Sequence, residues 1–220
     1  MIYKRKTLLC GHYGSGKTNV AVNMAYDLKN QYDKVSVADL DIVNPYFRTK
    51  DSAKDFEEKG IELICSDYAG SNVDIPALPG EIYSLTDQKD KYAVVDVGGD
   101  DRGALALGRI APAIKQENDY EMLFVINCFR PLTRDAASTL EVMQEIENAA
   151  NMKFTAIVNN SNLGEETTRE DVLKSLAYAD EVSKITKLPI KCTSVHNKLY
   201  DDLKDEIPNA FPLKLQDKIN

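Results

Sequence analysis

The chain has few of the residues that build metal clusters or disulfide frameworks. Its 220 residues include four cysteines and two histidines. The cysteines are far apart, form no Cys-x-x-Cys pair and have no histidine at ligand spacing; they are Cys10, Cys65, Cys128 and Cys192. The sequence therefore indicates neither a zinc site nor a disulfide framework. Each cysteine falls in or at the end of a predicted strand, where a reduced thiol behaves as a small hydrophobic side chain.

Long apolar runs and an excess of basic residues are also missing. No apolar stretch approaches the roughly 20 residues that a helix needs to span a bilayer. The N-terminal residues 1–6 lack the apolar region and the cleavage site of a signal peptide. A net charge of -8 argues against binding to the DNA backbone, because phosphate neutralisation needs clustered lysines and arginines. We therefore expect a cytoplasmic protein with no stable membrane association and no nucleic-acid partner.

The composition that remains is typical of a soluble globular domain. Hydrophobic residues make up 43% and charged residues 28% of the chain, with no internal repeat and no low-complexity tract. A chain of this length can bury a sizeable core, and one α/β domain is the simplest division. We therefore predict a single domain over residues 1–220.

Short β-branched and apolar runs alternate with stretches of helical periodicity. This alternation is typical of parallel strands joined by crossover helices. Apolar residues recur at i, i+4 and i+8 between Val20 and Leu28, and a second helix is predicted over about residues 133–149. We predict a three-layer αβα sandwich with a mostly parallel sheet of about seven strands. The predicted strands are Thr7–Cys10, Lys34–Leu40, Ile61–Cys65, Tyr92–Val97, Met122–Cys128, Thr155–Asn159 and Pro189–Thr193.

Two segments do not follow this pattern. Ser66–Gly80 contains several glycines and prolines and no period, which predicts a loop beside the site. The tail Phe211–Asn220 places Leu215 and Ile219 four residues apart. This tail is too short and too weakly apolar to indicate a membrane-surface helix.

The stretch "GHYGSGKT" at residues 11–18 lies between the first predicted strand and the first predicted helix. Its spacing fits a phosphate-binding loop, in which glycines turn successive N–H groups into one concavity at a helix N-terminus. We expect the lysine to reach the β- and γ-phosphates and the threonine hydroxyl to join a Mg²⁺ shell. The predicted ligand-binding residues of this loop are Gly11, Gly14, Ser15, Gly16, Lys17 and Thr18. The alternative is a glycine-rich turn with a solvated lysine.

Carboxylates follow two of the predicted strands. Asp39 and Asp41 end the second strand, and Asp96 precedes Gly98 and Gly99 at the end of the fourth. Ligands collect at the carboxyl edge of parallel sheets, where such acids could hold Mg²⁺ and orient water. We predict Asp41 and Asp96 as catalytic residues with the loop lysine, and as metal-holding residues with the loop threonine. Asp39 could equally cap the following turn.

The segments "GHYGSGKT", "VSVADLDIVNP", "VVDVGGD" and "AIVNNS", in this order, resemble the MinD/ParA and CobQ/CobB-like family of P-loop proteins, of the SIMIBI class. The resemblance covers most of residues 3–195. It implies that Asp41 positions the attacking water and that Asn159 recognises the base. The alternative for Asn159 is a turn residue at a strand end.

The base is predicted from the four residues Asn159–Asn162. Guanine-specific sites usually carry Asn-Lys-x-Asp, whose carboxylate accepts two hydrogen bonds from guanine. The amide of Asn162 stands where that carboxylate would be, and an amide offers a single carbonyl. The sequence therefore favours ATP and Mg²⁺ as cofactors.

One residue departs from the family pattern. Partition and division-site ATPases carry a signature lysine five residues before the loop lysine, which reaches across a dimer to the partner's phosphates. This chain has His12 there, and a histidine is shorter and mostly neutral at pH 7. Two arginine-bearing segments could compensate, Asn44–Arg48 and Cys128–Asp135 with Arg130 and Arg134, although either could serve an interface or a surface ion pair. A homodimer held by other contacts stays open.

The motifs together predict a Mg²⁺-dependent ATP-binding protein, a slow ATPase that acts as a nucleotide-controlled switch on an unknown protein partner. One alternative is an ATP-dependent ligase or synthetase resembling dethiobiotin synthetase or the cobyrinate amidases, which lack the signature lysine. Another is an adaptor or metallocofactor-insertion partner that binds ATP without hydrolysing it.

Overall fold

The computed structural model describes residues 1–40, 49–65, 80–99 and 101–216. Its strands form one sheet of eight, in the order β3-β2-β4-β1-β5-β6-β7-β8, and every neighbouring pair is parallel. The strands are β1 (Lys6–Cys10), β2 (Val35–Leu40), β3 (Glu62–Cys65), β4 (Tyr92–Val97), β5 (Tyr120–Ile126), β6 (Ala156–Asn159), β7 (Ile190–His196) and β8 (Ala210–Leu213). The predicted α/β sandwich is confirmed, and its sheet is parallel throughout the described residues.

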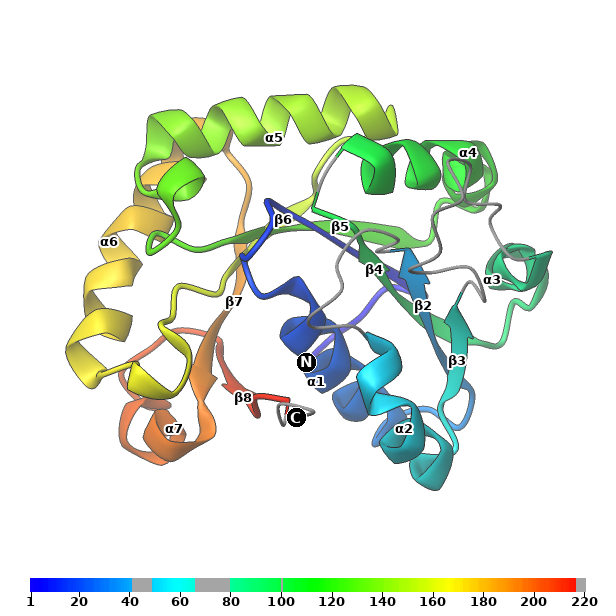
Figure 1. Ribbon diagram of the computed structural model, residues 1–220, viewed down its shortest axis with the longest axis horizontal. Helices are drawn as coiled ribbons and strands as arrows, with labels where there is room; N and C mark the ends of the chain where they lie inside the picture. Colours follow the sequence, from blue (N-terminus) through cyan, green and yellow to red (C-terminus); the bar gives the residue numbers. More distant parts are fainter. Residues whose placement is uncertain (41–48, 66–79, 100, 217–220) are drawn as a thin grey trace.

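Helices cover both faces of this sheet, as Figure 1 shows, with α4 and α5 on one side and α1 and α2 on the other. The α-helices are α1 (Lys17–Lys29), α2 (Ala53–Lys59), α3 (Ser84–Asp87), α4 (Asp101–Glu117), α5 (Ala136–Ala150), α6 (Arg169–Thr186) and α7 (Asn197–Leu203). Short 3₁₀ helices are η1 (Thr49–Ser52), η2 (Gly80–Tyr83), η3 (Pro131–Thr133) and η4 (Gly164–Glu166). The fold therefore has three layers.

Alternate residues of the central strands enter different cores. Leu8 and Cys10 of β1 belong to the core under α4 and α5, whereas Leu9 belongs to the core under α1. Strands with both faces covered are apolar almost without interruption, which explains the continuous runs in the sequence. The predicted apolar face of α1, from Val20 to Leu28, is buried and confirms the helical period.

Two of the differences from the sequence-based expectation have a clear physical reason. The eighth strand, β8, occupies part of the tail for which no strand was predicted. Its four residues contain the exposed Pro212, and proline is tolerated in a sheet mainly on an edge strand such as this one. Helix α5 begins at Ala136, three residues later than predicted, because the Asp135 side chain caps it by accepting from the Ser138 N–H at 2.9 Å.

Further expectations concern the loop after β3, membrane-spanning helices and the cysteines. The predicted loop Ser66–Gly80 lies outside the described residues as far as residue 79. Within the described residues, no helix has both the length and the apolar character needed to cross a membrane. None of the four cysteines forms a disulfide, and Cys10 and Cys192 are buried.

Candidate functional site

The loop between β1 and α1, residues 11–16, depends on its glycines. Gly14 and Gly16 have φ angles of 77° and 84°, in the left-handed region that glycine enters without steric cost. A Cβ atom on Gly11 would lie 2.3 Å from the carbonyl oxygen of Val125 on β5. The first glycine is therefore required because β5 passes beside it, and the other two are required because the backbone turns there.

Two carbonyl groups of this loop are held by side chains from other loops. Arg130 Nε, after β5, donates to the Gly14 carbonyl at 2.7 Å, and Asn160 Nδ2, after β6, donates to the Ser15 carbonyl at 2.7 Å. A trans peptide unit directs its N–H opposite to its C=O. The Gly16 N–H therefore points away from Asn160, and it could donate to an anion on the other side of the loop.

The N-terminus of α1 is uncapped and carries a buried lysine. Its N-cap residue is Gly16, no side chain caps it, and no acidic residue lies in its first turn. Lys17 is 5% exposed, and its Nζ donates to the His12 carbonyl at 3.2 Å. The buried Ser15 hydroxyl has no hydrogen-bond partner among the described residues. A helix N-terminus with a unit positive charge and an unused donor is suited to bind phosphate.

Two carboxylates lie side by side on the strands next to this loop. Asp39 of β2 pairs in register with Asp96 of β4, which pairs in turn with Leu9 of β1. Residues in register share a face of a parallel sheet, so both acids lie on the α1 side, where Leu9 is packed. Asp96 is fully buried, and its Oδ2 accepts a hydrogen bond from Thr49 Oγ1 at 2.9 Å.

The pKa of the Cys10 thiol, at the end of β1, depends on burial and on charges from two sides of the site. Burial is the main cause that raises the pKa of this thiol. The positive charge of Lys17 lowers this pKa, and the negative charge of Asp96 raises it further. The lysine of the loop and the acid of β4 therefore both lie within electrostatic reach of the end of β1.

The turn after β4 lies directly against the loop. A Cβ atom on Gly99 would come within 2.6 Å of the Tyr13 backbone nitrogen and 2.9 Å of Lys17 Nζ. Only a glycine allows this approach of two backbones. Gly99, three residues after Asp96, therefore lies beside the lysine.

The asparagines after β6 have different surroundings. Asn159 is fully buried; its Nδ2 donates to Ser175 Oγ at 3.0 Å, and its Oδ1 accepts from the Ser161 N–H at 3.3 Å. Asn162 Oδ1 accepts from the Gly164 N–H at 3.0 Å. Both polar atoms of Asn159 thus have partners within the protein, and base recognition by Asn159 stays a prediction.

Sequence reasoning missed Asn160 and Thr49. Asn160 is 1% exposed and connects the Ser15 carbonyl to the Ser194 hydroxyl of β7, which donates to its Oδ1. The doubled asparagine was a signal, because adjacent residues at a strand end point in opposite directions. Thr49 gave no comparable signal, since its contact with Asp96 spans 47 residues.

The remaining predicted residues divide into two groups. Asp41 and Arg48 lie outside the described residues, so their roles stay predictions. His12 is partly exposed, and its Nδ1 lies 2.9 Å from the Tyr13 carbonyl oxygen.

Among the described residues, no group of three or more histidine, cysteine, aspartate or glutamate side chains could hold a metal ion. A Mg²⁺ site here would use Asp96 and the hydroxyl of Thr18.

Asn160→Ala is expected to lower the free energy of unfolding by about 2–4 kcal/mol, because it leaves the buried Ser15 carbonyl and Ser194 hydroxyl without this partner. Urea denaturation followed by circular dichroism measures the change. The control is Asn30→Ala, at an exposed position whose side chain makes no hydrogen bond within the described part of the chain. Equal stabilities of the two variants would show that Asn160 does not secure the loop.

Comparison with known proteins identifies the fold. No protein-family model and no curated protein matches the chain. Cell division protein FtsY from Thermotoga maritima matches with a TM-score of 0.57 and 17% identity, over 86% of this chain and 61% of that one. FtsY from Mycoplasma mycoides matches with 0.55 and 18%, over 86% and 59%. The signal recognition particle receptor FtsY from Elizabethkingia anophelis, solved in complex with GDP, matches with 0.50 and 16%, over 89% and 58%.

These similarities concern the fold alone, because the identities are low. The chain has the FtsY-like P-loop NTPase fold, with an eight-stranded parallel sheet flanked by helices. It spans about three fifths of the length of these FtsY structures. Membership of the SIMIBI class, and of the MinD/ParA and CobQ/CobB-like family within it, stays a prediction.

Proposed function

We propose that the chain is a Mg²⁺-dependent ATP-binding protein and a slow ATPase, whose nucleotide state controls its shape or its association with a partner. The observation that carries this proposal is the loop at residues 11–16. Its carbonyl groups at Gly14 and Ser15 are held from outside, and it leads into an uncapped helix N-terminus beside Lys17. That arrangement offers main-chain N–H groups and one positive charge to a polyphosphate.

The residues around the loop fit a magnesium ion bound with the nucleotide. Thr18 lies in the first turn of α1, and Asp96 lies on the neighbouring strand at the same edge of the sheet. A hydroxyl and a carboxylate are hard oxygen ligands of the kind that Mg²⁺ prefers. We propose that these two side chains would hold Mg²⁺, which neutralises phosphate charge when bound.

Hydrolysis in this proposal uses groups of the chain for positioning. Lys17 binds the β- and γ-phosphates, and the turn at Gly99 lies beside the lysine, where the terminal phosphate would be. Water attacks the γ-phosphorus in line with the leaving oxygen, and Asp41 orients that water. The single domain over residues 1–220 and the cytoplasmic location remain part of the proposal.

The choice of ATP is supported by the loop after β6. Asn162 brings an amide where a guanine-specific carboxylate would stand, and its Nδ2 donates to the Asn160 carbonyl at 2.9 Å. A side chain tied back to its own loop gives guanine no paired acceptor. The FtsY structure from Elizabethkingia anophelis holds GDP, so guanine nucleotides are the necessary comparison.

Calorimetric titration with ATP and with GTP, each with Mg²⁺ and with EDTA, tests this proposal. We expect ATP to bind more tightly than GTP and both to bind more tightly with Mg²⁺. Size-exclusion chromatography and phosphate release, measured on the same sample with ATP and Mg²⁺, then test the switch and the ATPase. The absence of binding to either nucleotide would overturn the proposed function, and tighter binding of GTP would overturn the choice of base.

A further inference from the structure

The chain beyond β8 runs along α1. Asn23 pairs with the Lys214 backbone in both directions: Nδ2 donates to the carbonyl at 2.8 Å, and Oδ1 accepts from the N–H at 2.9 Å. One helical turn earlier, Asn19 Oδ1 accepts from the Gln216 N–H at 2.8 Å. Side chains four residues apart on a helix are about 6 Å apart, close to the span of two residues in an extended chain. The two asparagines therefore hold residues 214–216 against α1.

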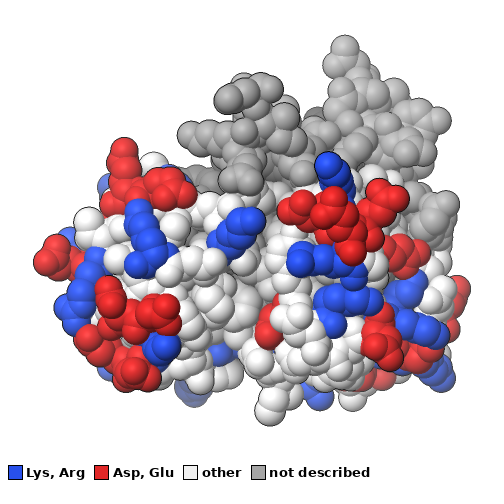
Figure 2. Space-filling view, turned by 90° about the horizontal axis from the view of Figure 1, so that it is seen from below, with Lys and Arg blue, Asp and Glu red and all other residues white. Residues whose placement is uncertain are grey.

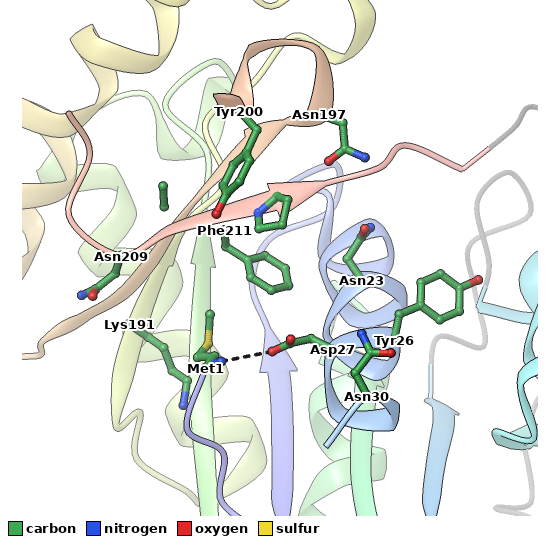
Figure 3. A pocket seen from close by; sticks show the side chains of 12 residues that line it. Met1, Asn23, Tyr26, Asp27, Asn30, Lys191, Asn197, Tyr200, Asn209 and Phe211 are labelled. Atoms are coloured by element: carbon green, nitrogen blue, oxygen red, sulfur yellow. Dashed lines mark hydrogen bonds and ion pairs between the residues drawn. The ribbon is translucent and has the colours of Figure 1, made fainter. Parts of the chain in front are cut away.

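The surface between α7 and α2 carries few charged side chains. Figure 2 shows charged side chains on the side of α7 and on the side of α2, with a largely uncharged strip between them. A groove of about 500 Å³ lies here between α1, α7 and β8, and Figure 3 shows Asn23 on the α1 wall of it, near Phe211. The contacts of residues 214–216 with α1 are neutral hydrogen bonds, so added salt screens them little.

Gln216 also contacts the short helix η1. Its Nε2 donates to Ser52 Oγ at 2.8 Å, and Ser52 is 7% exposed at the end of η1. The first residue of η1 is Thr49, whose hydroxyl holds the Asp96 carboxylate. Gln216 therefore binds the short helix that orients Asp96.

A second contact of Gln216 also leads toward the proposed magnesium site. Asn19, which accepts from its N–H, directly follows Thr18 in the first turn of α1. Gln216 thus bonds both to the helix that carries Thr18 and to the short helix whose Thr49 holds Asp96. A contact that served only to attach the tail would be provided already by Asn23.

We propose that Gln216 is a positioning residue for the proposed magnesium site, acting through Ser52 and Thr49 on the carboxylate of Asp96; this inference rests on the proposed function. The hydrogen bond to Ser52 fixes η1 relative to α1. Thr49 then holds Asp96 in one rotamer, facing the helix that carries Thr18. A carboxylate held in place loses less side-chain freedom when it engages a cation.

The test compares Gln216→Ala, Ser52→Ala and the double variant with wild type, by ATP titrations over a series of Mg²⁺ concentrations and in EDTA. We expect each single variant to raise the Mg²⁺ concentration for half-maximal ATP affinity about 3- to 10-fold, as loss of one hydrogen bond implies. Affinity in EDTA should change less than about 2-fold, since no phosphate contact is removed. The double variant should show the same Mg²⁺ concentration for half-maximal ATP affinity as the single variants. Ser52→Thr keeps a hydroxyl and should retain the wild-type value.

The matched control is Gln31→Ala near the far end of α1, where Gln31 Nε2 donates to the Asp27 carbonyl. This variant should have the wild-type Mg²⁺ dependence. An unchanged Mg²⁺ dependence in Gln216→Ala, or an equal loss of affinity in EDTA, would overturn the inference while leaving the proposed function intact. Failure of wild type to bind ATP at any Mg²⁺ concentration would instead overturn the proposed function. Thermal unfolding by circular dichroism verifies that each variant is folded.

Discussion

Lys17→Ala is expected to weaken ATP binding by at least about 100-fold, because two charge-assisted hydrogen bonds to phosphate oxygens are lost. The side chain is 5% exposed at the start of α1, so solvent competes little with a bound phosphate. Isothermal titration calorimetry with Mg²⁺ and ATP measures the change. The fold should survive, because the His12 carbonyl keeps its second hydrogen bond, from the Ser15 N–H at 3.1 Å.

A second lysine on the same helix provides the control for this experiment. Lys29 lies in the last turn of α1, where its Nζ bonds to the Asp33 carbonyl. Lys29→Ala removes the same charge from the same helix and should leave ATP affinity within about 2-fold of wild type. If Lys17→Ala bound ATP as tightly as Lys29→Ala does, the phosphate-loop assignment would be wrong.

Gly16→Ala is expected to lower the free energy of unfolding by about 2–4 kcal/mol and to weaken ATP binding at least about 30-fold. The φ of 84° strains any residue with a Cβ, and that atom would lie 2.3 Å from Asn160 Nδ2. Asn160 would have to release the Ser15 carbonyl, and the peptide that directs the Gly16 N–H would be free to turn. Urea denaturation and calorimetry measure the two effects.

Gly60→Ala is the control that separates the effect of backbone strain from the effect of a steric clash. Gly60 ends α2 with a φ of 65°, and the nearest atom to an added Cβ is Lys29 Nζ at 3.7 Å. This variant should lose only about 1–2 kcal/mol of stability through strain, with unchanged ATP affinity. A loss of ATP affinity in Gly60→Ala as large as that in Gly16→Ala would mean that general destabilisation, and not the geometry of the loop, limits binding.

Much of the fold could be predicted because its signals are local. The apolar period of α1 and the short apolar runs that became strands depend on residues within a few positions of each other. The loop at residues 11–16 could be placed for the same reason, since glycine spacing and the flanking strand and helix are contiguous. The four-residue β8 was missed because Pro212 removes a backbone donor, and only its edge position in the sheet makes that acceptable.

The contacts that shape the site could not be predicted in this way. Three hydrogen bonds that shape the site join residues between 47 and 145 positions apart in the sequence. They are those of Arg130 to Gly14, Asn160 to Ser15 and Thr49 to Asp96. Such pairs meet only because of the order in which the strands are laid side by side.

The sequence by itself determined the class of fold, the position of the loop at residues 11–16 and the strand that carries Asp96, because each follows from spacing along a continuous stretch of backbone. Only the tertiary structure decided that Asn160 secures the loop while Asn159 faces Ser175, and that Gln216 reaches Ser52. The physical reason is that hydrogen-bond partners of buried polar groups are chosen by strand order and by the direction of each side chain. Neither the strand order nor the choice of hydrogen-bond partners produces a periodic pattern in the sequence.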